Sequence, residues 1–121
     1  MAVFKRFEDI KAWQKAREVT KQIYQISADE KFFRDYGLPD QIRRSAVSSM
    51  ANIAEGNGRK TNKDFANFLV VAHGSAAETQ SHLYVALDLQ YITQEQFSEI
   101  YEKLEETSKM TMALCSHLLK S

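Results

Sequence analysis

Apolar side chains recur at intervals of three and four residues along most of the chain, the spacing that places them on one face of an α-helix. Four stretches show this pattern, and no stretch alternates with the period of two that is typical of a strand. The pattern predicts helices at about residues 8–28, 39–56, 61–90 and 93–119. Because four helices with short connections pack most simply as a bundle, we expect residues 1–121 to form one all-α domain, an antiparallel up-down four-helix bundle.

Residues at the breaks in the pattern suit the ends of helices. Pro39 fits the first turn of the second helix, where its missing N–H costs no hydrogen bond. The run Gly56-Asn57-Gly58 is expected to end that helix in the left-handed conformation. Thr61 with Asp64 forms a weak capping box, and the run Thr93-Gln94-Glu95-Gln96 forms a full one that predicts the start of the fourth helix.

The chain carries more apolar surface than one thin bundle is expected to cover. Gly74-Ser75-Ala76-Ala77 lies in the middle of a predicted helix, where glycine costs about 1 kcal/mol relative to alanine. This small patch is explained either by the close approach of another helix of the same chain or by that of a second subunit. Self-association is predicted, because exposed apolar patches usually mark interfaces. Phe32 and Phe33, in the break at residues 29–37, are too apolar to be left in water. The aromatic residues on which the expectation of self-association rests are Trp13, Tyr24, Phe32, Phe33, Phe68, Tyr84 and Tyr101.

Charge is balanced in total but not along the chain. With 16 basic and 16 acidic residues the formal net charge is zero, which removes the simplest argument for a nucleic-acid-binding domain. Residues 1–60 carry 12 basic and 8 acidic side chains, a net +4, and residues 61–121 carry 4 basic and 8 acidic, a net −4. Three interpretations stay open: oppositely charged helix faces that meet within the bundle, complementary surfaces between subunits, or nucleic acid bound by the basic half.

Candidate phosphate contacts come from this basic half. Lys11 and Lys15 are one helical turn apart, so the first predicted helix has basic character along its exposed side. Two dipeptides, Arg43-Arg44 and Arg59-Lys60, add to it in and after the second predicted helix. If these six residues bind RNA or DNA, affinity is expected to fall steeply as salt is raised.

Polar residues close to the predicted core form a second candidate set. A buried carboxylate is costly unless it is paired, so Glu55 or Glu78 is expected to meet an arginine, a histidine or a helix N-terminus. A structural or interface role is favoured over catalysis for such groups. The set of structural or interface candidates is Asn52, Glu55, Gly74, Ser75 and Glu78.

Signs of catalysis and of metal binding are weak. None of the three histidines has a glutamate three positions before it, so the di-iron pattern of helical bundles is missing. Glu78 and His82 share a helix face, which is commoner as a surface pair than as part of a metal site. The single cysteine, Cys115, cannot form an internal disulfide and is typical of a packed thiol. We expect no enzyme activity, no catalytic residue, no metal, no cofactor and no small-molecule substrate.

The compartment is predicted from the absence of apolar runs. The longest, Phe68–Ala72, is far shorter than the roughly 20 residues that span a bilayer. Glu8 and Asp9 stand where a signal peptide would need apolar residues. We therefore expect a cytoplasmic protein that does not enter a membrane.

Several runs of residues resemble a known family. In this order they are Phe7-Glu8-Asp9-Ile10 with Trp13-Gln14-Lys15-Ala16, Gln41-Ile42-Arg43-Arg44-Ser45-Ala46, Asn52-Ile53-Ala54-Glu55-Gly56 before Gly58-Arg59, and Gly74-Ser75-Ala76-Ala77-Glu78. They resemble the four-helix-bundle proteins encoded in intervening sequences of bacterial 23S ribosomal RNA genes. The resemblance implies an up-down bundle, a homo-pentamer, a bacterial cytoplasmic setting and no established enzyme activity. It also implies kinship with the accessory bundle protein of diversity-generating retroelements, a basic pentamer associated with nucleic acid.

Two functional hypotheses follow for a non-catalytic, oligomeric bundle. The first is an RNA- or ribosome-associated binding protein that contacts phosphates through the six basic residues named above. The alternative is a protein–protein interaction scaffold that binds no nucleic acid, in which Arg43, Arg44 and Arg59 pair with carboxylates across subunits.

Overall fold

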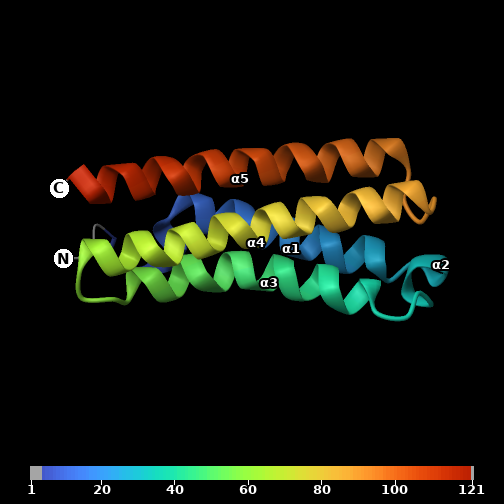
Figure 1. Ribbon diagram of the computed structural model, residues 1–121, viewed down its shortest axis with the longest axis horizontal. Helices are drawn as coiled ribbons and strands as arrows, with labels where there is room; N and C mark the ends of the chain where they lie inside the picture. Colours follow the sequence, from blue (N-terminus) through green and yellow to red (C-terminus); the bar gives the residue numbers. More distant parts are fainter. Residues whose placement is uncertain (1–3, 121) are drawn as a thin grey trace.

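The computed structural model describes residues 4–120, and every regular element in that range is a helix. The four long helices are α1 (Lys11–Ser27), α3 (Leu38–Asn57), α4 (Asn62–Asp88) and α5 (Gln94–Lys120). A 3-10 helix, η1 (Phe7–Asp9), precedes them, and a single turn of helix, α2 (Glu30–Phe33), lies between α1 and α3. The long helices lie side by side in Figure 1, so the described chain is a helical bundle. The predicted all-α fold class is confirmed.

Connecting segments gather at the two ends of the bundle. Residue 4, the C-terminal end of α5 and the α3–α4 turn lie at one end in Figure 1, and α2 lies at the other end with the α4–α5 turn. Helix α3 packs against α4, α4 packs against α5, and α1 packs against both α3 and α5. Helix α1 therefore has a groove on each side, one against α3 and one against α5.

Two clusters of apolar side chains fill the bundle, one toward each end. The cluster beside α2 contains Phe32, Ile42 and Leu83, and the cluster toward the chain ends contains Ile53 and Leu69; all five side chains are 0% exposed. Moving each such side chain out of water stabilises the fold by about 1.5–3 kcal/mol. Burial of the helically spaced apolar side chains therefore stabilises the bundle at both of its ends.

The first long helix starts later than its spacing predicts. Its expected start lies near residue 8, but η1 ends at Asp9 and Ile10 has an extended backbone (φ −78°, ψ 119°), so α1 begins at Lys11. The break after α1 contains the short helix α2, which the apolar pattern did not predict. This turn buries Phe32 completely and leaves Phe33 56% exposed, so the expectation that both rings leave water is right for one of them.

Capping residues define the starts of α4 and α5. The amide of Gln96 donates to Thr93 Oγ1 at 3.1 Å, and the amide of Thr93 donates to Gln96 Oε1 at 2.9 Å, which confirms the full capping box. At α4 the amide of Asp64 donates to Thr61 Oγ1 at 3.1 Å. Each bond satisfies a backbone group that has no partner within the helix.

The left-handed conformation predicted at the end of the second long helix is wrong. Helix α3 continues through Asn57, and Gly58 has an ordinary φ of −83°. Gly37, before α3, has φ 105°, and among the described non-glycine residues the positive φ belongs to Gln90, with φ 61°, after the end of α4. There the amides of Gln90 and Tyr91 donate to carbonyl oxygens of the last turn of α4, so a Schellman motif closes the helix without glycine.

Small and hydroxyl-bearing side chains make the contact between α3 and α4. The buried hydroxyls of Ser45 and Thr79 lie 2.7 Å apart, so they satisfy each other in the core. A Cβ built on Gly56 would lie 2.8 Å from Phe65 Cδ1 and 2.8 Å from Phe68 Cβ. The two helices therefore approach so closely at Gly56 that a larger residue must push them apart.

Long polar side chains, in contrast, join α1 to α5. The ammonium of Lys103 donates to Gln22 Oε1 at 3.0 Å, and Lys15 Nζ lies 3.8 Å from Glu106 Oε2. These contacts show that part of the opposite charge of the two halves of the chain meets within one molecule. None of the helices in residues 4–120 has the length and apolarity needed to cross a membrane.

Candidate nucleic-acid interface

The six predicted phosphate contacts do not form one patch. Arg43 and Arg44 lie in the half of α3 nearer α2, whereas Arg59 and Lys60 lie in the turn after α3, at the other end of the bundle. Thirteen residues of helix follow Arg44 before α3 ends at Asn57, about 20 Å along the axis. The remaining two, Lys11 and Lys15, lie in the first turns of α1. The sequence identified the basic residues but not their separation.

Arg43 is held against α1 by two hydrogen bonds and two aromatic rings. Its Nε donates to Ser27 Oγ at 2.7 Å, and its Nη2 donates to the carbonyl oxygen of Tyr24 at 3.4 Å. The guanidinium carbon lies 4.6 Å from the centre of the Tyr24 ring and 5.7 Å from that of Phe33. An arginine fixed in this way presents its charge in a defined place, because its side chain is not free to rotate.

A groove beside Arg43 is open to solvent. Its cavity has a volume of about 470 Å³ and lies between α1 and α3. Tyr24, 44% exposed, forms the α1 wall, and the exposed Arg44 lies on the α3 wall. The residues that line this groove, which we call the α1–α3 groove, are Tyr24, Asp40, Arg43, Arg44, Val47 and Ser48.

A second arginine lies over an aromatic ring farther along α1. The Arg17 guanidinium carbon is 5.8 Å from the centre of the Trp13 ring, beside a hollow of about 340 Å³ that Lys21 also lines. Trp13 and Tyr24 are eleven residues apart, three turns of helix, so both rings lie toward the same side of α1. Aromatic rings that alternate with cations along one face match the chemistry of single-stranded nucleic acid.

The other four predicted basic residues lie elsewhere on the molecule. Lys15 Nζ lies 3.8 Å from both Glu18 and Glu106. The Arg59 guanidinium carbon lies 5.0 Å from the centre of the Phe68 ring. Lys11 and Lys60 are exposed on the surface. These four residues are therefore outside the α1–α3 groove.

Both candidate carboxylates are exposed rather than buried, and one of them, Glu78, meets a histidine as expected. Glu55 faces solvent at the end of α3. The side chain of Glu78 is 59% exposed, and its Oε2 lies 3.3 Å from Nε2 of His82 one turn later. This is the surface pair that the spacing of the two residues favoured. Asn52 lies against the α3–α4 contact, where its amide donates to the carbonyl oxygen of Ser48 at 2.8 Å.

The small-residue patch of α4 packs within the chain in part. Ser75 is buried and its hydroxyl lies 2.9 Å from that of Ser48 on α3, so this part of the patch does pack within the chain. Gly74 is exposed, however, and a Cβ built on it would meet nothing within 4 Å. No helix of residues 4–120 approaches Gly74, so packing within the chain explains the Ser75 part of the patch and leaves Gly74 on the surface.

Exposed residues around Gly74 are uncharged over several turns of α4. Val70 is 52% exposed, Val71 53% and Val85 43%, and Ala77 and Ser81 are also exposed. Only Glu78 interrupts this surface with a charge. We call the set Val70, Val71, Gly74, Ala77, Ser81 and Val85 the α4 face.

Sequence reasoning missed the α1 residues that hold Arg43. Tyr24 was counted only as an excess aromatic residue, and Ser27 was not singled out. The contacts of Tyr24 and Ser27 with Arg43, which we call the Arg43 clamp, depend on how α1 and α3 are placed along each other, and no short-range spacing in the sequence determines that placement. The alternation of Arg17, Lys21 and Tyr24 at intervals of three and four was the signal that could have found the α1 wall.

A basic, aromatic groove and an uncharged helix face are the distinguishing surfaces of this small all-helical bundle protein. The family model for the 23S rRNA-intervening sequence protein matches residues 8–113. The chain belongs to this family, as its resemblance in sequence indicated.

A solved structure shares the fold. It is the crystal structure of a protein of unknown function from the S23 ribosomal protein family of Bacteroides thetaiotaomicron. The two chains are 29% identical and superpose with a TM-score of 0.79, over 86% of this chain and 97% of the other. No curated protein matches the sequence. The family is therefore established, and the function of this solved relative is unknown.

Proposed function

We propose that this protein is a non-catalytic, cytoplasmic RNA-binding protein that works as a homo-oligomer. In this proposal its long helices run antiparallel in up-down order, the α1–α3 groove binds single-stranded RNA, and the α4 face joins the subunits. The observation that carries the RNA proposal is the clamped Arg43, stacked on an exposed tyrosine beside a second, exposed arginine.

The groove offers the two kinds of contact that unpaired RNA needs. Arg43 and Arg44 supply adjacent positive charges for phosphate oxygens, and Asp40 is the one acidic side chain that lines the cavity among the described residues. The exposed ring of Tyr24 supplies a surface on which a base can stack, a contact of about 1–3 kcal/mol. Paired bases are already stacked on each other, so single-stranded RNA is the better ligand.

The α4 face supports self-association. Several valines that are about half exposed lie around a glycine that leaves room for the backbone of another helix. Contiguous apolar surface of this kind is typical of interfaces. The homo-pentamer implied by the family resemblance is the oligomer that we propose.

A scaffold without nucleic acid is the rival function. It is favoured by the α4 face, which needs a protein partner, and by the zero net charge of the chain. In the scaffold, the exposed Arg44 and Arg59 pair with carboxylates such as Glu55 of another subunit. The two functions differ in what the arginines of α3 contact.

Exchange of Arg43 and Arg44 for glutamine separates the two functions. We expect the R43Q/R44Q variant to bind a labelled, mixed-sequence single-stranded RNA about tenfold or more weakly than the unmodified protein in fluorescence anisotropy, with the oligomer intact. The matched control K109Q/K120Q loses the same charge from α5 and is expected to bind normally. The RNA affinity of the unmodified protein should also fall as salt is raised. A plot of the logarithm of the binding constant against the logarithm of the salt concentration should have a slope of about −0.7 for each phosphate contacted.

Two results would contradict the RNA proposal. One is equal RNA affinity of the two double variants, which would place any RNA elsewhere on the molecule. The other is dissociation of the oligomer by R43Q/R44Q without a change in RNA affinity per subunit, which supports the scaffold. Light scattering on the same samples measures the second outcome.

A further inference from the structure

The short helix α2 and the residues after it carry exposed aromatic rings. Phe33, the last residue of α2, is 56% exposed, whereas its neighbour Phe32 is 0% exposed and fastens the helix to the core. Tyr36 is 104% exposed, so the fold leaves its ring entirely in solvent. Neither exposed ring contributes to the core, and large exposed side chains that gather in one place are typical of a binding surface.

One of these rings lies against the arginine of the α1–α3 groove. The Arg43 guanidinium carbon is 5.7 Å from the centre of the Phe33 ring and 4.6 Å from that of Tyr24. The same cation therefore lies close to one ring from α1 and one from α2. Helix α2 thus adds an aromatic ring beside the Arg43 clamp.

A hollow of about 380 Å³ continues from the groove toward Tyr36. It is lined by residues 33–37 together with Pro39 and Asp40, and we call it the α2 hollow. Asp40 also lines the α1–α3 groove, so the groove and the hollow meet at the first turn of α3. The cation that lines the α2 hollow is Arg34, whose side chain is 73% exposed and lies 3.7 Å from Glu30. Such a surface pair is weak, so Arg34 is able to contact a phosphate instead.

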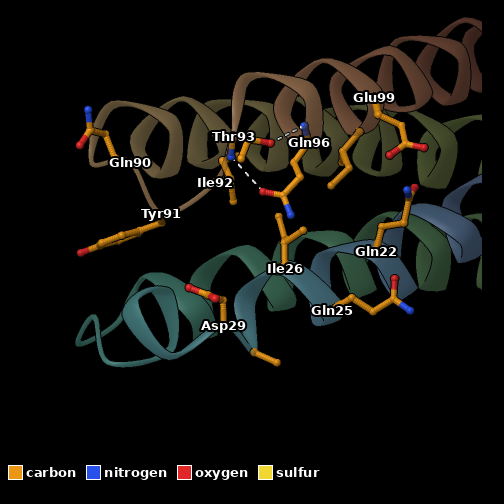
Figure 2. A pocket seen from close by; sticks show the side chains of 12 residues that line it. Gln22, Gln25, Ile26, Asp29, Gln90, Tyr91, Ile92, Thr93, Gln96 and Glu99 are labelled. Carbon is orange, nitrogen blue, oxygen red and sulfur yellow. Dashed lines mark hydrogen bonds between the residues drawn. The ribbon is translucent and has the colours of Figure 1, made fainter.

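Hydrogen bonds at Asp35 hold the turn that presents Tyr36. Asp35 Oδ1 accepts from the amide of Leu38 at 3.2 Å, and Asp35 Oδ2 accepts from the hydroxyl of Tyr91 at 2.6 Å. Figure 2 shows Tyr91 extending from the α4–α5 turn. The carboxylate of Asp35 is therefore used within the chain. Because the turn is held in place, less conformational entropy is lost when a ligand stacks on the Tyr36 ring.

We infer that the RNA path of the α1–α3 groove continues into the α2 hollow, where Phe33 and Tyr36 each stack on an unpaired base. This inference rests on the RNA-binding function proposed above. Rings and cations alternate along the path, which is the arrangement that single-stranded nucleic acid requires. From the groove to the hollow they are Tyr24, Arg43, Phe33, Arg34 and Tyr36. The ligand is therefore a segment with at least three unpaired nucleotides, one for each ring.

Two double variants test this inference in fluorescence anisotropy with a labelled octaadenylate RNA. F33L/Y36L keeps apolar side chains but removes both rings, and it should bind about tenfold or more weakly than the unmodified protein. The matched F33Y/Y36F keeps both rings and should bind normally. An abasic chain with the same number of phosphates has no base to stack, so it should bind both variants equally. Both positions are exposed, and circular dichroism establishes that the helices are intact.

Equal affinity of F33L/Y36L and F33Y/Y36F for the octaadenylate would overturn the inference. R43Q/R44Q, measured beside them, then tests the groove separately. If this variant alone binds weakly, the groove remains the RNA site and only its extension is lost; if all three bind normally, the proposed function falls as well. A change of oligomer in F33L/Y36L by light scattering, with RNA affinity unchanged, also overturns the inference, because another subunit then covers the rings.

Discussion

Helices α4 and α5 are each 27 residues long and pack against each other, yet their outer surfaces are unlike. Both bury a helical stripe of apolar side chains in the same core. On the outside α5 is strongly charged, with five acidic residues along its length, whereas α4 carries no charge between Asp64 and Glu78. Both helices meet the same demands in the core, so the difference lies in their outer surfaces alone. In the proposed homo-oligomer, α5 faces water and α4 is covered by another subunit.

The largest expected effect comes from giving α4 a surface like that of α5. The V71E/V85E variant places two carboxylates on the α4 face and should weaken self-association about a hundredfold or more, because like charges from two subunits would be brought together. Sedimentation equilibrium measures the change. The matched variant A113E/L119E makes the same replacement at exposed positions of α5 and should leave the oligomer intact. A monomeric unmodified protein at micromolar concentration would remove the interface altogether.

Substitution of Gly56 and of Gly74 compares a glycine packed against another helix of the chain with a glycine on the surface. Gly56→Ala should destabilise the fold by about 1–3 kcal/mol, since its new methyl group overlaps Phe65 and Phe68 of α4. Gly74→Ala meets nothing within the chain and should stabilise the isolated subunit by up to about 1 kcal/mol. Urea denaturation of both variants under dissociating conditions gives the two values. Equal destabilisation by the two substitutions would contradict this assignment.

The N-terminal caps of the two helices differ by one hydrogen bond. Thr93→Ala breaks the reciprocal box of α5 and should cost about 1 kcal/mol, whereas Thr61→Ala removes the single bond at α4 and should cost about 0.5 kcal/mol. Thermal denaturation ranks the two. Gln96→Ala is the control, because it removes only the returning bond of the box and should fall between the unmodified protein and Thr93→Ala.

The connection between α4 and α5 contains a strained residue. Gln90 has φ 61°, which favours glycine, so Gln90→Gly should raise the free energy of unfolding by about 0.5–1 kcal/mol. The adjacent Leu89→Gly is the matched control, since Leu89 has an ordinary φ of −86° and should only lose stability. A destabilised Gln90→Gly variant would mean that the glutamine side chain contributes more than its backbone strain costs.

The smallest effect concerns the hydrogen bond between the α4–α5 turn and the segment after α2. Tyr91 donates to Asp35 Oδ2 at 2.6 Å, and this bond to a carboxylate raises the pKa of Tyr91 above its ordinary value of 10.0. A raised pKa means that the contact stabilises the fold fully below about pH 10 and is lost as pH rises through the folded-state pKa. The stability advantage over Tyr91→Phe should therefore shrink between about pH 9 and pH 12 in thermal denaturation. An advantage that grows with pH would contradict the assignment.

Local sequence patterns predicted the long helices well because each signal acts within a few residues. The Thr93 capping box and the three- and four-residue spacing of buried side chains belong to this kind. Helix α2 was missed because one turn is too short to show periodicity. The left-handed residue was assigned to the wrong helix end because Gln90 adopts without glycine the conformation that glycine favours.

Contacts between helices were the part that the sequence could not predict. Arg43 and Arg44 were identified by charge, but the Tyr24 and Ser27 clamp depends on how α1 and α3 are placed against each other. The two mid-chain glycines show the same limit. Gly56 was interpreted as a helix end and lies at a close helix contact, whereas Gly74 was interpreted as a close contact and faces open space.

Both ends of the described chain lie at the same end of the bundle (Figure 1). A fusion partner or surface tether at either terminus is therefore separated from α2 by the length of α4, about 40 Å for 27 residues of helix. The α1–α3 groove beside Arg43 lies nearer the α2 end. A protein captured by its terminus on a biosensor chip would thus present this groove to the flowing solution, and a fluorescent label at either terminus would lie far from it.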